Sequence, residues 1–379
     1  MKKIYYGRAV YDHKEINAVV KVLKNNSLSL TDGKNVKQLE KIVSKMFGKK
    51  YGLMVNSGSS ANLLGLASFD FKKGSEIITP NLTFSTTVAP IYQLGLIPHF
   101  VGVEKNKFVA DFNHIERCIN KKTVAIMIPN LLGNIANWEK ISQIAKKYKL
   151  KVIEDSADTI GYTFNKKDTG IYSDIVTNSF YASHIINGGG TGGIVCFNDD
   201  KLYKKAKLLR GWGRSSATFN ESESIDKRFN VKISGIDYDA KYVFSEMGYN
   251  FLPSEISAVF ALEQLKKLKD NIKIRNRNFS QLISFFKNHN DLFNLPEMYP
   301  GVKTPWLAFP LVIKKNKLFN RKELQIHFEQ NNIQTRTIFT GNILKQPVMK
   351  NGILLGCHHG MSISDVNTIC KIFLKFINK

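Results

Sequence analysis

Between residues 51 and 197, short apolar runs alternate with longer segments, and this alternation restricts the fold more than any other feature of the sequence. The runs with the length and composition of strands are 51–55, 76–78, 97–103, 123–128, 151–153, 174–180 and 194–197. The segments of helical length between them are 61–69, 85–94, 112–119 and 138–148. Strands that alternate with helices predict an α/β fold, with a mostly parallel central sheet and helices on both faces. Ligand sites in such sheets form at the carboxyl ends of the strands.

The sequence on either side of this region predicts two domains. Helical periodicity is present in residues 12–24 and 36–46, and a long helical pattern begins at residue 255. The elements expected after it are a strand at 306–313, a helix at 321–331, a strand at 334–338 and a closing helix at 363–377. We therefore expect a large α/β domain in residues 1–250 and a smaller C-terminal α+β domain in residues 251–379.

Composition excludes several classes of protein. With 379 residues, 43% of them hydrophobic, the chain can bury a large core. No apolar run approaches the roughly 20 residues of a membrane helix, and the first residues lack the apolar core of a signal peptide, so we expect a cytoplasmic protein. The four cysteines show neither a C-x-x-C pair nor metal-ligand spacing, so we expect free thiols and no metal site.

The formal net charge of +24 raises the question of a polyanionic partner. The basic residues are scattered along the chain, often as Lys-Lys pairs, and form neither one block nor a nucleic-acid-binding motif. This pattern predicts a charged exterior and no nucleic-acid site. Such a surface would also raise the local concentration of a substrate that carries a diphosphate.

Candidate site residues follow the first two predicted strands. Gly58, Ser59 and Ser60 open a predicted helix, where free N–H groups and the helix dipole favour a phosphate. Serine and glycine are also ordinary caps and turn residues, so this motif is weak alone. Phe84 follows the second strand, and its flat ring suits a heteroaromatic ligand, although an isolated phenylalanine is usually a core residue.

Two acids, a serine and a histidine follow later strands. Asp155 and Asp158 come after the fifth predicted strand, where a carboxylate is costly unless it is paired. Ser179 lies in the sixth strand, and His184 stands five residues later. The glycine-rich segment 188–193 comes next, and there the backbone can approach a ligand closely. An isolated histidine at a strand end is more often structural than catalytic, so the neighbouring motifs decide its meaning.

In this order, the motifs resemble those of the DegT/DnrJ/EryC1/StrS sugar aminotransferases, which are pyridoxal phosphate-dependent enzymes of fold type I. In that family, the pattern Ser-Phe-x-x-x-Lys ends in the lysine that holds the cofactor as a Schiff base. Here His184 occupies the lysine position, and a Schiff base needs a primary amine. The histidine branch of the family comprises sugar 3-dehydratases of the colitose and ascarylose pathways. These enzymes use pyridoxamine phosphate to remove the C3 hydroxyl of a nucleotide-linked 4-keto-6-deoxy sugar.

The resemblance implies a role for each motif in a cofactor site. Gly58, Ser59, Ser60 and Ser179 would bind the cofactor phosphate, and Phe84 would lie over the pyridine ring.

The acids and two further residues also have implied roles. Asp155 would pair with the pyridinium nitrogen and so keep the ring able to accept electrons, and Asp158 would lie near the 3-hydroxyl of the ring. Asn250 would reach the cofactor phosphate of a neighbouring subunit, which implies a homodimer with shared active sites. Arg336, in the segment 335–342, would bind the carboxylate of glutamate, the amino donor, as a bidentate fork. From sequence alone, a surface ion pair of Arg336 is an equally good interpretation.

The sequence departs from the family in two places. Relatives read Glu-Gly-Gly in the glycine loop, with one residue fewer, whereas here the run is Gly190-Thr191-Gly192-Gly193. The region from Arg210 resembles the ascarylose-pathway enzyme, but its iron–sulfur cysteines are missing here. Because thiolates are the ligands of such clusters, we expect no iron–sulfur cluster and no partner reductase.

The resemblance therefore implies a pyridoxamine phosphate-dependent 3-dehydratase that makes a 3,6-dideoxy-4-keto sugar for surface polysaccharides such as O-antigen. His184 would take a proton from C4′ of the cofactor and return one to the C3 oxygen, because an imidazole pKa of about 6.5 suits both steps near neutral pH. Three alternatives stay open: an aminotransferase that uses another lysine, an enzyme that needs a separate reductase, and a catalytically altered protein that binds the cofactor or a polyanion. The nucleotide and the hexose are left undetermined.

Overall fold

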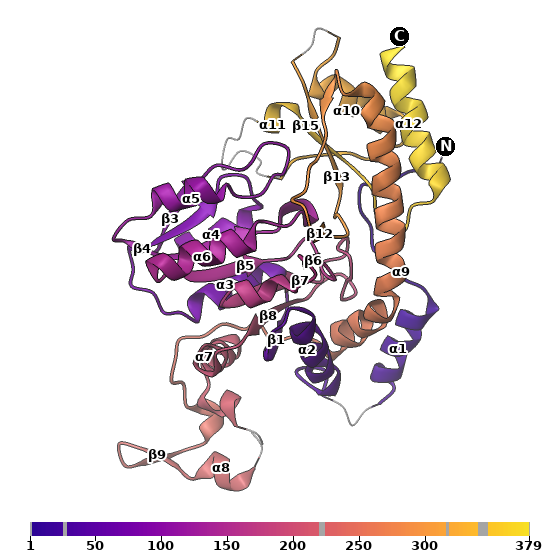
Figure 1. The fold of residues 1–379 in the computed structure, drawn as a ribbon. Coiled ribbons are helices and arrows are strands. Elements are labelled where there is room, and N and C mark those ends of the chain that lie inside the picture. Colours follow the sequence, from indigo (N-terminus) through magenta and orange to yellow (C-terminus); the bar gives the residue numbers. More distant parts are fainter. Residues whose placement is uncertain (1, 26–28, 220–223, 316–317, 340–347, 379) are drawn as a thin grey trace.

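The computed structural model describes residues 2–25, 29–219, 224–315, 318–339 and 348–378, and within them lies a seven-stranded sheet (Figure 1). The order of its strands is β1-β8-β7-β5-β4-β2-β3. Their bounds are β1 Tyr51–Val55, β2 Glu76–Pro80, β3 Ile97–Val101, β4 Thr123–Pro129, β5 Lys151–Asp155, β7 Ile175–Ser179 and β8 Gly193–Phe197. Neighbouring strands from β3 to β7 are parallel, and β8 runs antiparallel to both of its neighbours. The expected mostly parallel sheet is confirmed.

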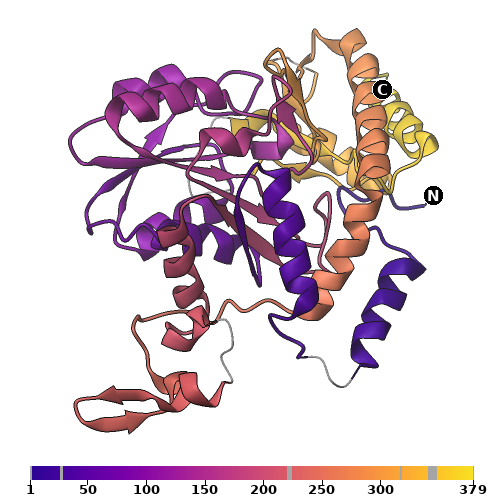
Figure 2. The same ribbon diagram turned by 60° about the horizontal axis from the view of Figure 1, so that its bottom comes forward.

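Helices cover both faces of this sheet (Figure 2). On one face pack α3 (Gly58–Ala67), α4 (Ser85–Gln93) and α7 (Asp200–Arg210). On the other pack α2 (Lys34–Met46), α5 (Phe112–Cys118), α6 (Trp138–Tyr148) and the first half of α9 (Glu255–Phe286). Successive strand residues such as Ile77 and Ile78 belong to the two different clusters, because strand side chains alternate between faces. Both faces are therefore apolar, as a covered parallel sheet requires.

The C-terminal part is smaller and contains a second, antiparallel sheet in the order β11-β13-β15-β14. Its elements are β11 Phe293–Asn294, β13 Phe309–Ile313, α10 Arg321–Gln330, β14 Arg336–Thr337, α11 Val348–Asn351, β15 Gly352–Leu355 and α12 Ile363–Ile377. The expected α+β character is confirmed. The 32-residue helix α9 spans both parts, since Ala258 packs in the core of the large sheet and Phe286 in the core of the small one. The division at residue 250 stays a prediction.

The N-terminal segment lies between the two parts. Ile4 pairs with Ile333 beside the small sheet, and α1 (His13–Leu23) then packs along α9. Residues 5–10 therefore pass from one part of the protein to the other. A further two-stranded ribbon, β6 (Thr163–Phe164) with β12 (Val302–Lys303), also joins the two parts.

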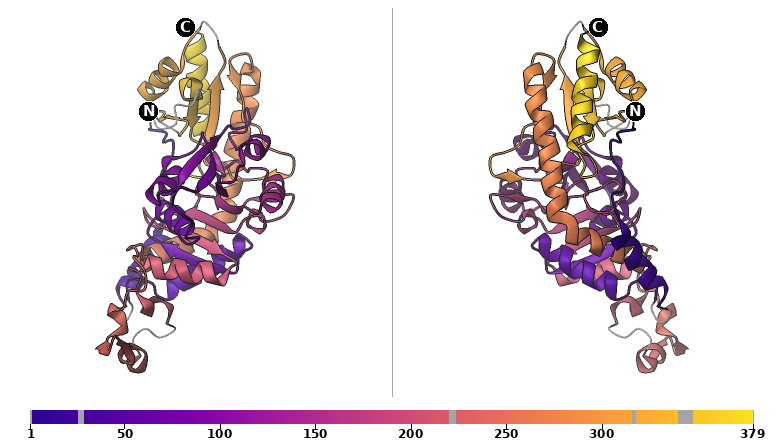
Figure 3. Two further views of the ribbon diagram at one scale, coloured as in Figure 1. Left: turned by 90° about the vertical axis from the view of Figure 1, so that its left-hand side faces the viewer. Right: turned by 90° about the vertical axis from the view of Figure 1, so that its right-hand side faces the viewer.

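An arm, residues 224–247, projects away from the body of the protein (Figures 1 and 3). It comprises α8 (Ile225–Phe229) and the hairpin of β9 (Val231–Ile233) and β10 (Ile236–Tyr238). Apolar side chains on it are exposed, including Ile225 at 75% and Met247 at 94%.

Candidate active site

A cavity of about 770 Å³ opens where β1, β5 and β7 end. These strands run in the same direction, so their carboxyl ends bring together residues that are far apart in the sequence. The predicted site residues that line the cavity are Gly58, Ser59, Phe84, Asp155, Asp158, Ser179, His184 and Arg336. Two predicted residues, Ser60 and Asn250, do not line it. The C-terminal part adds lining residues, among them Leu307, Arg336 and Phe339.

The N-terminus of α3 forms one end of the cavity. Ser57 caps the helix, and its hydroxyl accepts the Ser60 N–H at 3.0 Å and donates to the Ser60 hydroxyl at 2.9 Å. The Ser60 hydroxyl is therefore hydrogen-bonded to the capping serine, and Ser60 does not line the cavity. A side chain on Gly58 would put its Cβ 2.5 Å from Cβ of Ser179, so only glycine permits this close approach. Gly58, Ser59 and Ser179 meet at the positive end of a helix dipole, which favours a phosphate.

Asp155 is a buried carboxylate at the end of β5, only 4% exposed. Its Oδ2 accepts hydrogen bonds from Asn62 Nδ2 and from the Thr87 hydroxyl, both at 2.8 Å, and its Oδ1 accepts the Ala157 N–H at 3.1 Å. Burial raises the pKa of Asp155. All three donors are neutral, so the carboxylate gains further stability from a cationic ligand. The pyridinium nitrogen of the expected cofactor is such a cation.

The partners of Asp155 were not predicted. Asn62 lies on α3 and is held by the Thr177 hydroxyl of β7 at 2.6 Å, while Thr87 lies on α4 and accepts from Thr83 at 2.9 Å. Three separate elements therefore orient the acid. The sequence signal for Asn62 and Thr87 is slight, since each is one polar residue on the buried face of a helix.

Asp158 borders the same cavity and keeps part of its surface open to it. Its Oδ2 accepts the Leu132 N–H at 2.8 Å. Burial raises the pKa of Asp158 to about 7, and the charge of Asp155 contributes in the same direction. The group can therefore hold or release a proton near neutral pH.

Phe84 is 52% exposed at the cavity, so the alternative of an ordinary core residue does not apply. Its ring contacts Phe339 edge-on, with the centroids 6.0 Å apart. A flat face beside a cavity can cover a heteroaromatic ring.

His184 lies in the cavity wall, in the turn that follows β7. Its Nδ1 is 3.3 Å from the Ser179 carbonyl oxygen. Because a carbonyl only accepts, Nδ1 carries the proton and Nε2 is the basic nitrogen of the neutral ring. Burial lowers the pKa of His184 to about 4, and Arg275 adds to this effect. The value is lower than the expected 6.5, because the sequence does not show how the assembled chain packs around the ring.

Arg336 lies at the mouth of the cavity and is exposed. Its guanidinium donates to the neighbouring Thr335 carbonyl at 2.8 Å and lies 5.8 Å from the centre of the Tyr6 ring. Neither partner is an acid, so the group can meet a carboxylate of a ligand. Residues 340–342 of the predicted segment lie outside the described residues.

The cavity is also lined by Tyr6, Gly7 and Arg8, which no sequence motif predicted. Cβ of a residue at Gly7 would lie 3.0 Å from Cβ of Ser183, the residue before His184. The start of the chain therefore packs directly against the histidine turn.

Asn250 is exposed and lies at the base of the arm, paired with Gly211. It does not line the cavity of its own chain. Its role toward a neighbouring subunit stays a prediction.

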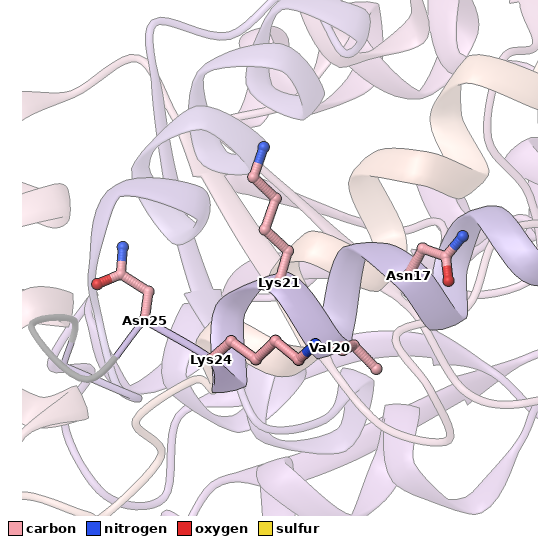
Figure 4. Close-up of a pocket in the computed structure, with 5 residues that line it drawn as sticks. All are labelled: Asn17, Val20, Lys21, Lys24 and Asn25. Carbon is pink, nitrogen blue, oxygen red and sulfur yellow. The ribbon is translucent and has the colours of Figure 1, made fainter.

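A second hollow, of about 550 Å³, lies along α1 (Figure 4). Its lining residues are Asn17, Val20, Lys21, Lys24 and Asn25. Because none of these is an acid, this hollow offers no partner for a pyridinium nitrogen. Across the described ranges, no cluster of side chains has the composition to hold a metal ion, and none of the helices has both the length and the apolar character needed to cross a membrane.

Similar proteins belong to the family that the site residues indicated. The model of the DegT/DnrJ/EryC1/StrS aminotransferase family matches residues 10–354. Lipopolysaccharide biosynthesis protein RfbH of Salmonella typhimurium is 35% identical over 333 residues, which cover 85% of this chain and 76% of that protein. The GDP-4-keto-6-deoxy-D-mannose 3-dehydratase of Yersinia pseudotuberculosis is 33% identical over 349 residues, which cover 89% of this chain and 84% of that protein.

Solved structures of 3-dehydratases also have a similar fold. The E. coli GDP-4-keto-6-deoxy-D-mannose-3-dehydratase with bound hydrated PLP has a TM-score of 0.87 at 30% identity, covering 98% of this chain and 100% of that one. A GDP-4-keto-6-deoxymannose-3-dehydratase with a trapped PLP-glutamate geminal diamine has a TM-score of 0.87 at 29% identity, covering 97% and 99%.

The two-part architecture and the cavity at the strand ends define a pyridoxal phosphate-dependent transferase of fold type I. This fold class was expected from the sequence and is confirmed. The chain belongs to the DegT/DnrJ/EryC1/StrS aminotransferase family, as its motifs indicated.

Proposed function

We propose that this protein is a pyridoxamine phosphate-dependent 3-dehydratase, which converts a nucleotide-linked 4-keto-6-deoxyhexose into a 3,6-dideoxy-4-keto sugar for surface polysaccharides. The observation that carries the proposal is His184 in the cavity wall, with no lysine among the described residues that line it. Without a primary amine within reach, the cofactor is held with no covalent bond to the chain. The names of the relatives, which include 3-dehydratases and a lipopolysaccharide biosynthesis protein, support the same reaction and pathway class.

The residues of the cavity fit this cofactor. Gly58, Ser59 and Ser179 hold the phosphate at the α3 N-terminus, with Ser60 supporting the loop through its bond to the capping serine. Asp155 supplies the buried negative charge that a protonated ring nitrogen requires.

Two further residues of the cavity would meet the ring of the cofactor. Phe84 offers a flat face, and Asp158 offers a proton-sharing carboxyl for the 3-hydroxyl.

The chain contributes proton transfer and charge control to the reaction. When bound, pyridoxamine phosphate supplies an amine for the C4 ketone of the sugar and a ring that accepts electrons. His184 accepts the proton from C4′ of the cofactor at Nε2 and delivers a proton to the C3 oxygen as it leaves. The Ser179 carbonyl keeps Nδ1 protonated, so that Nε2 stays available for this transfer. Asp155 keeps the ring nitrogen protonated throughout.

Arg336, whose present partners are the Thr335 carbonyl and the Tyr6 ring, would bind the carboxylate of glutamate, the amino donor. The overall reaction then removes the C3 oxygen of the sugar and converts glutamate into 2-oxoglutarate and ammonia. Glutamate is the two-electron donor of this overall reaction, which would therefore need neither an iron–sulfur cluster nor a reductase.

The active form is a cytoplasmic homodimer with shared sites. The exposed apolar side chains of the arm supply a surface for the second copy. Asn250, which is paired with Gly211 and lies outside its own cavity, would then serve the partner's site.

The experiment combines the protein with pyridoxamine phosphate, glutamate and a panel of GDP-, CDP- and dTDP-linked 4-keto-6-deoxy sugars. Mass spectrometry is expected to find the 3-deoxygenated sugar from one of them, together with an equal amount of 2-oxoglutarate. His184→Asn should lower the rate by a factor of about 10² to 10⁴, the usual contribution of a general acid–base group. His13→Asn, at an exposed side chain on α1, is the matched control and should keep full activity.

Each rival function predicts a different result. An aminotransferase would yield a 4-amino sugar that keeps its C3 oxygen. An enzyme with a redox partner would deoxygenate only after a reductase is added. A polyanion-binding protein would turn over none of the sugars and would bind nucleic acid with a steep salt dependence.

A further inference from the structure

The glycine loop, residues 188–193, is tied to the strand that precedes His184. The Phe180 N–H donates to the Gly192 carbonyl at 2.9 Å, and the Gly188 N–H donates to the Phe180 carbonyl at 2.8 Å. After Phe180 the chain forms the turn that carries His184, and it then comes back so that Gly192 is hydrogen-bonded to Phe180. The position of the glycine loop and the position of the histidine turn are linked through this one residue.

The same loop contacts the start of the phosphate-binding loop. The Gly192 N–H donates to the Asn56 carbonyl at 3.0 Å, and Ser57 forms a β-bridge with Gly192. A Cβ on Gly193 would lie 2.4 Å from the Ser57 carbonyl carbon, so the two backbones touch. Residues 56–60 and 188–193 therefore form one unit at the phosphate end of the cavity.

Thr191 adds a side-chain bond to this unit. Its hydroxyl donates to the Asn56 carbonyl, which also receives the Gly192 N–H. The C=O of Asn56 and the N–H of Ser57 belong to one planar peptide unit, so a carbonyl held by two donors also fixes the direction of that N–H. Thr191 lines the cavity and stands between Gly190 (φ +116°) and Gly192 (φ +127°), whose backbones favour glycine.

We propose that Thr191 is a positioning residue, whose hydroxyl fixes the phosphate-binding loop relative to the His184 turn and thereby sets the affinity for the cofactor phosphate. This inference rests on the proposed function. It gives a role to the residue at which the glycine run departs from the Glu-Gly-Gly pattern. Thr191 is exposed, and its hydroxyl bond to Asn56 is the side-chain contact that ties it to the phosphate-binding loop.

The test measures the dissociation constants of pyridoxal phosphate and pyridoxamine phosphate by equilibrium dialysis, for wild type and three variants. Thr191→Val keeps the branched shape of the side chain and removes the hydroxyl donor. It should raise both dissociation constants about fivefold, which corresponds to about 1 kcal/mol for one hydrogen bond. Thr191→Ser restores the hydroxyl and should stay within about twofold of wild type. Thr368→Val is the matched control, because Thr368 makes the same kind of bond, to the Ser364 carbonyl at 2.8 Å, on the exposed face of α12.

Three outcomes would overturn the inference. Thr191→Val with wild-type affinity would mean that the bond does not position the loop. A raised KM for the nucleotide sugar at unchanged cofactor affinity would make Thr191 a substrate contact instead. Wild-type protein that binds neither form of the cofactor would overturn the proposed function as well, whereas the first two outcomes leave that function intact.

Discussion

Asp158→Asn should stabilise the cofactor-free protein, and the gain should depend on pH. The pKa of this carboxyl is about 7 in the folded chain against an ordinary value of 3.8. Below pH 3.8 the acid is protonated in both the folded and the unfolded chain, so it has no pH-dependent effect. As pH rises toward 7, the unfolded chain releases the proton and the folded chain retains it, so the free energy of unfolding falls.

The size of this effect follows from the shift. About three pH units correspond to about 4 kcal/mol at full ionisation. This figure is an upper bound, because Asp158 keeps part of its surface toward the cavity. Asparagine keeps an oxygen that can accept the Leu132 N–H and never ionises. Its advantage over wild type should therefore grow by about 2 kcal/mol between pH 5 and pH 8.

The measurement is urea-induced unfolding of both proteins without cofactor, at pH values from 5 to 8. The matched control is Asp237→Asn on the arm, where the side chain is 81% exposed and 3.6 Å from Lys232, and a surface pair contributes about 0–1 kcal/mol. A difference between Asp158→Asn and wild type that is the same at every pH would refute the assignment of a raised pKa to this acid.

Two further predictions concern the phosphate loop and the buried histidines. Gly58→Ala would put a new Cβ 2.5 Å from Cβ of Ser179. It should therefore abolish pyridoxal phosphate binding in a dialysis assay and lower the free energy of unfolding by about 1–3 kcal/mol. Normal binding would contradict the close contact. His359 accepts from Arg275 at 3.2 Å, and burial lowers its pKa to about 2, so the unfolded chain gains a proton below pH 6.5 that the folded chain does not. His359→Gln keeps an acceptor for Arg275 and has no group that titrates. Between pH 7 and pH 4.5, its free energy of unfolding, measured with urea, should fall by about 2 kcal/mol less than that of wild type. An equal fall in the two proteins would contradict a neutral buried ring.

Much of the fold could be predicted from the sequence, because its signals are local. Each buried parallel strand is a short apolar run, and the polar residue that follows the run lies at the carboxyl end of the sheet. Asp155 and Ser179 end two of these strands, Gly58 and His184 follow shortly after a strand end, and all four line the cavity. The predicted strand at 97–103 ends earlier, at Val101, where the chain leaves the sheet.

The parts that could not be predicted depend on contacts between distant segments. Asn62 and Thr87 lie on two helices, and only the assembled sheet brings them both to Asp155. Tyr6 enters the site because Ile4, near the start of the chain, pairs with Ile333 beside the small sheet. The low pKa of His184 depends on burial, which no local pattern reports.

His184 in place of the lysine should leave a B6 cofactor without a covalent link to the chain, which intact-protein mass spectrometry after incubation with pyridoxal phosphate and borohydride can test. Wild type should keep an unmodified mass, and His184→Lys, whose amine would lie in the same cavity wall, should gain the mass of one reduced cofactor. A stoichiometric adduct on wild-type protein, mapped to one lysine that reaches the cavity, would be the opposite result, because that lysine could hold the cofactor as a Schiff base. A His184→Lys variant that binds pyridoxal phosphate and stays unmodified would mean that residue 184 does not face the cofactor.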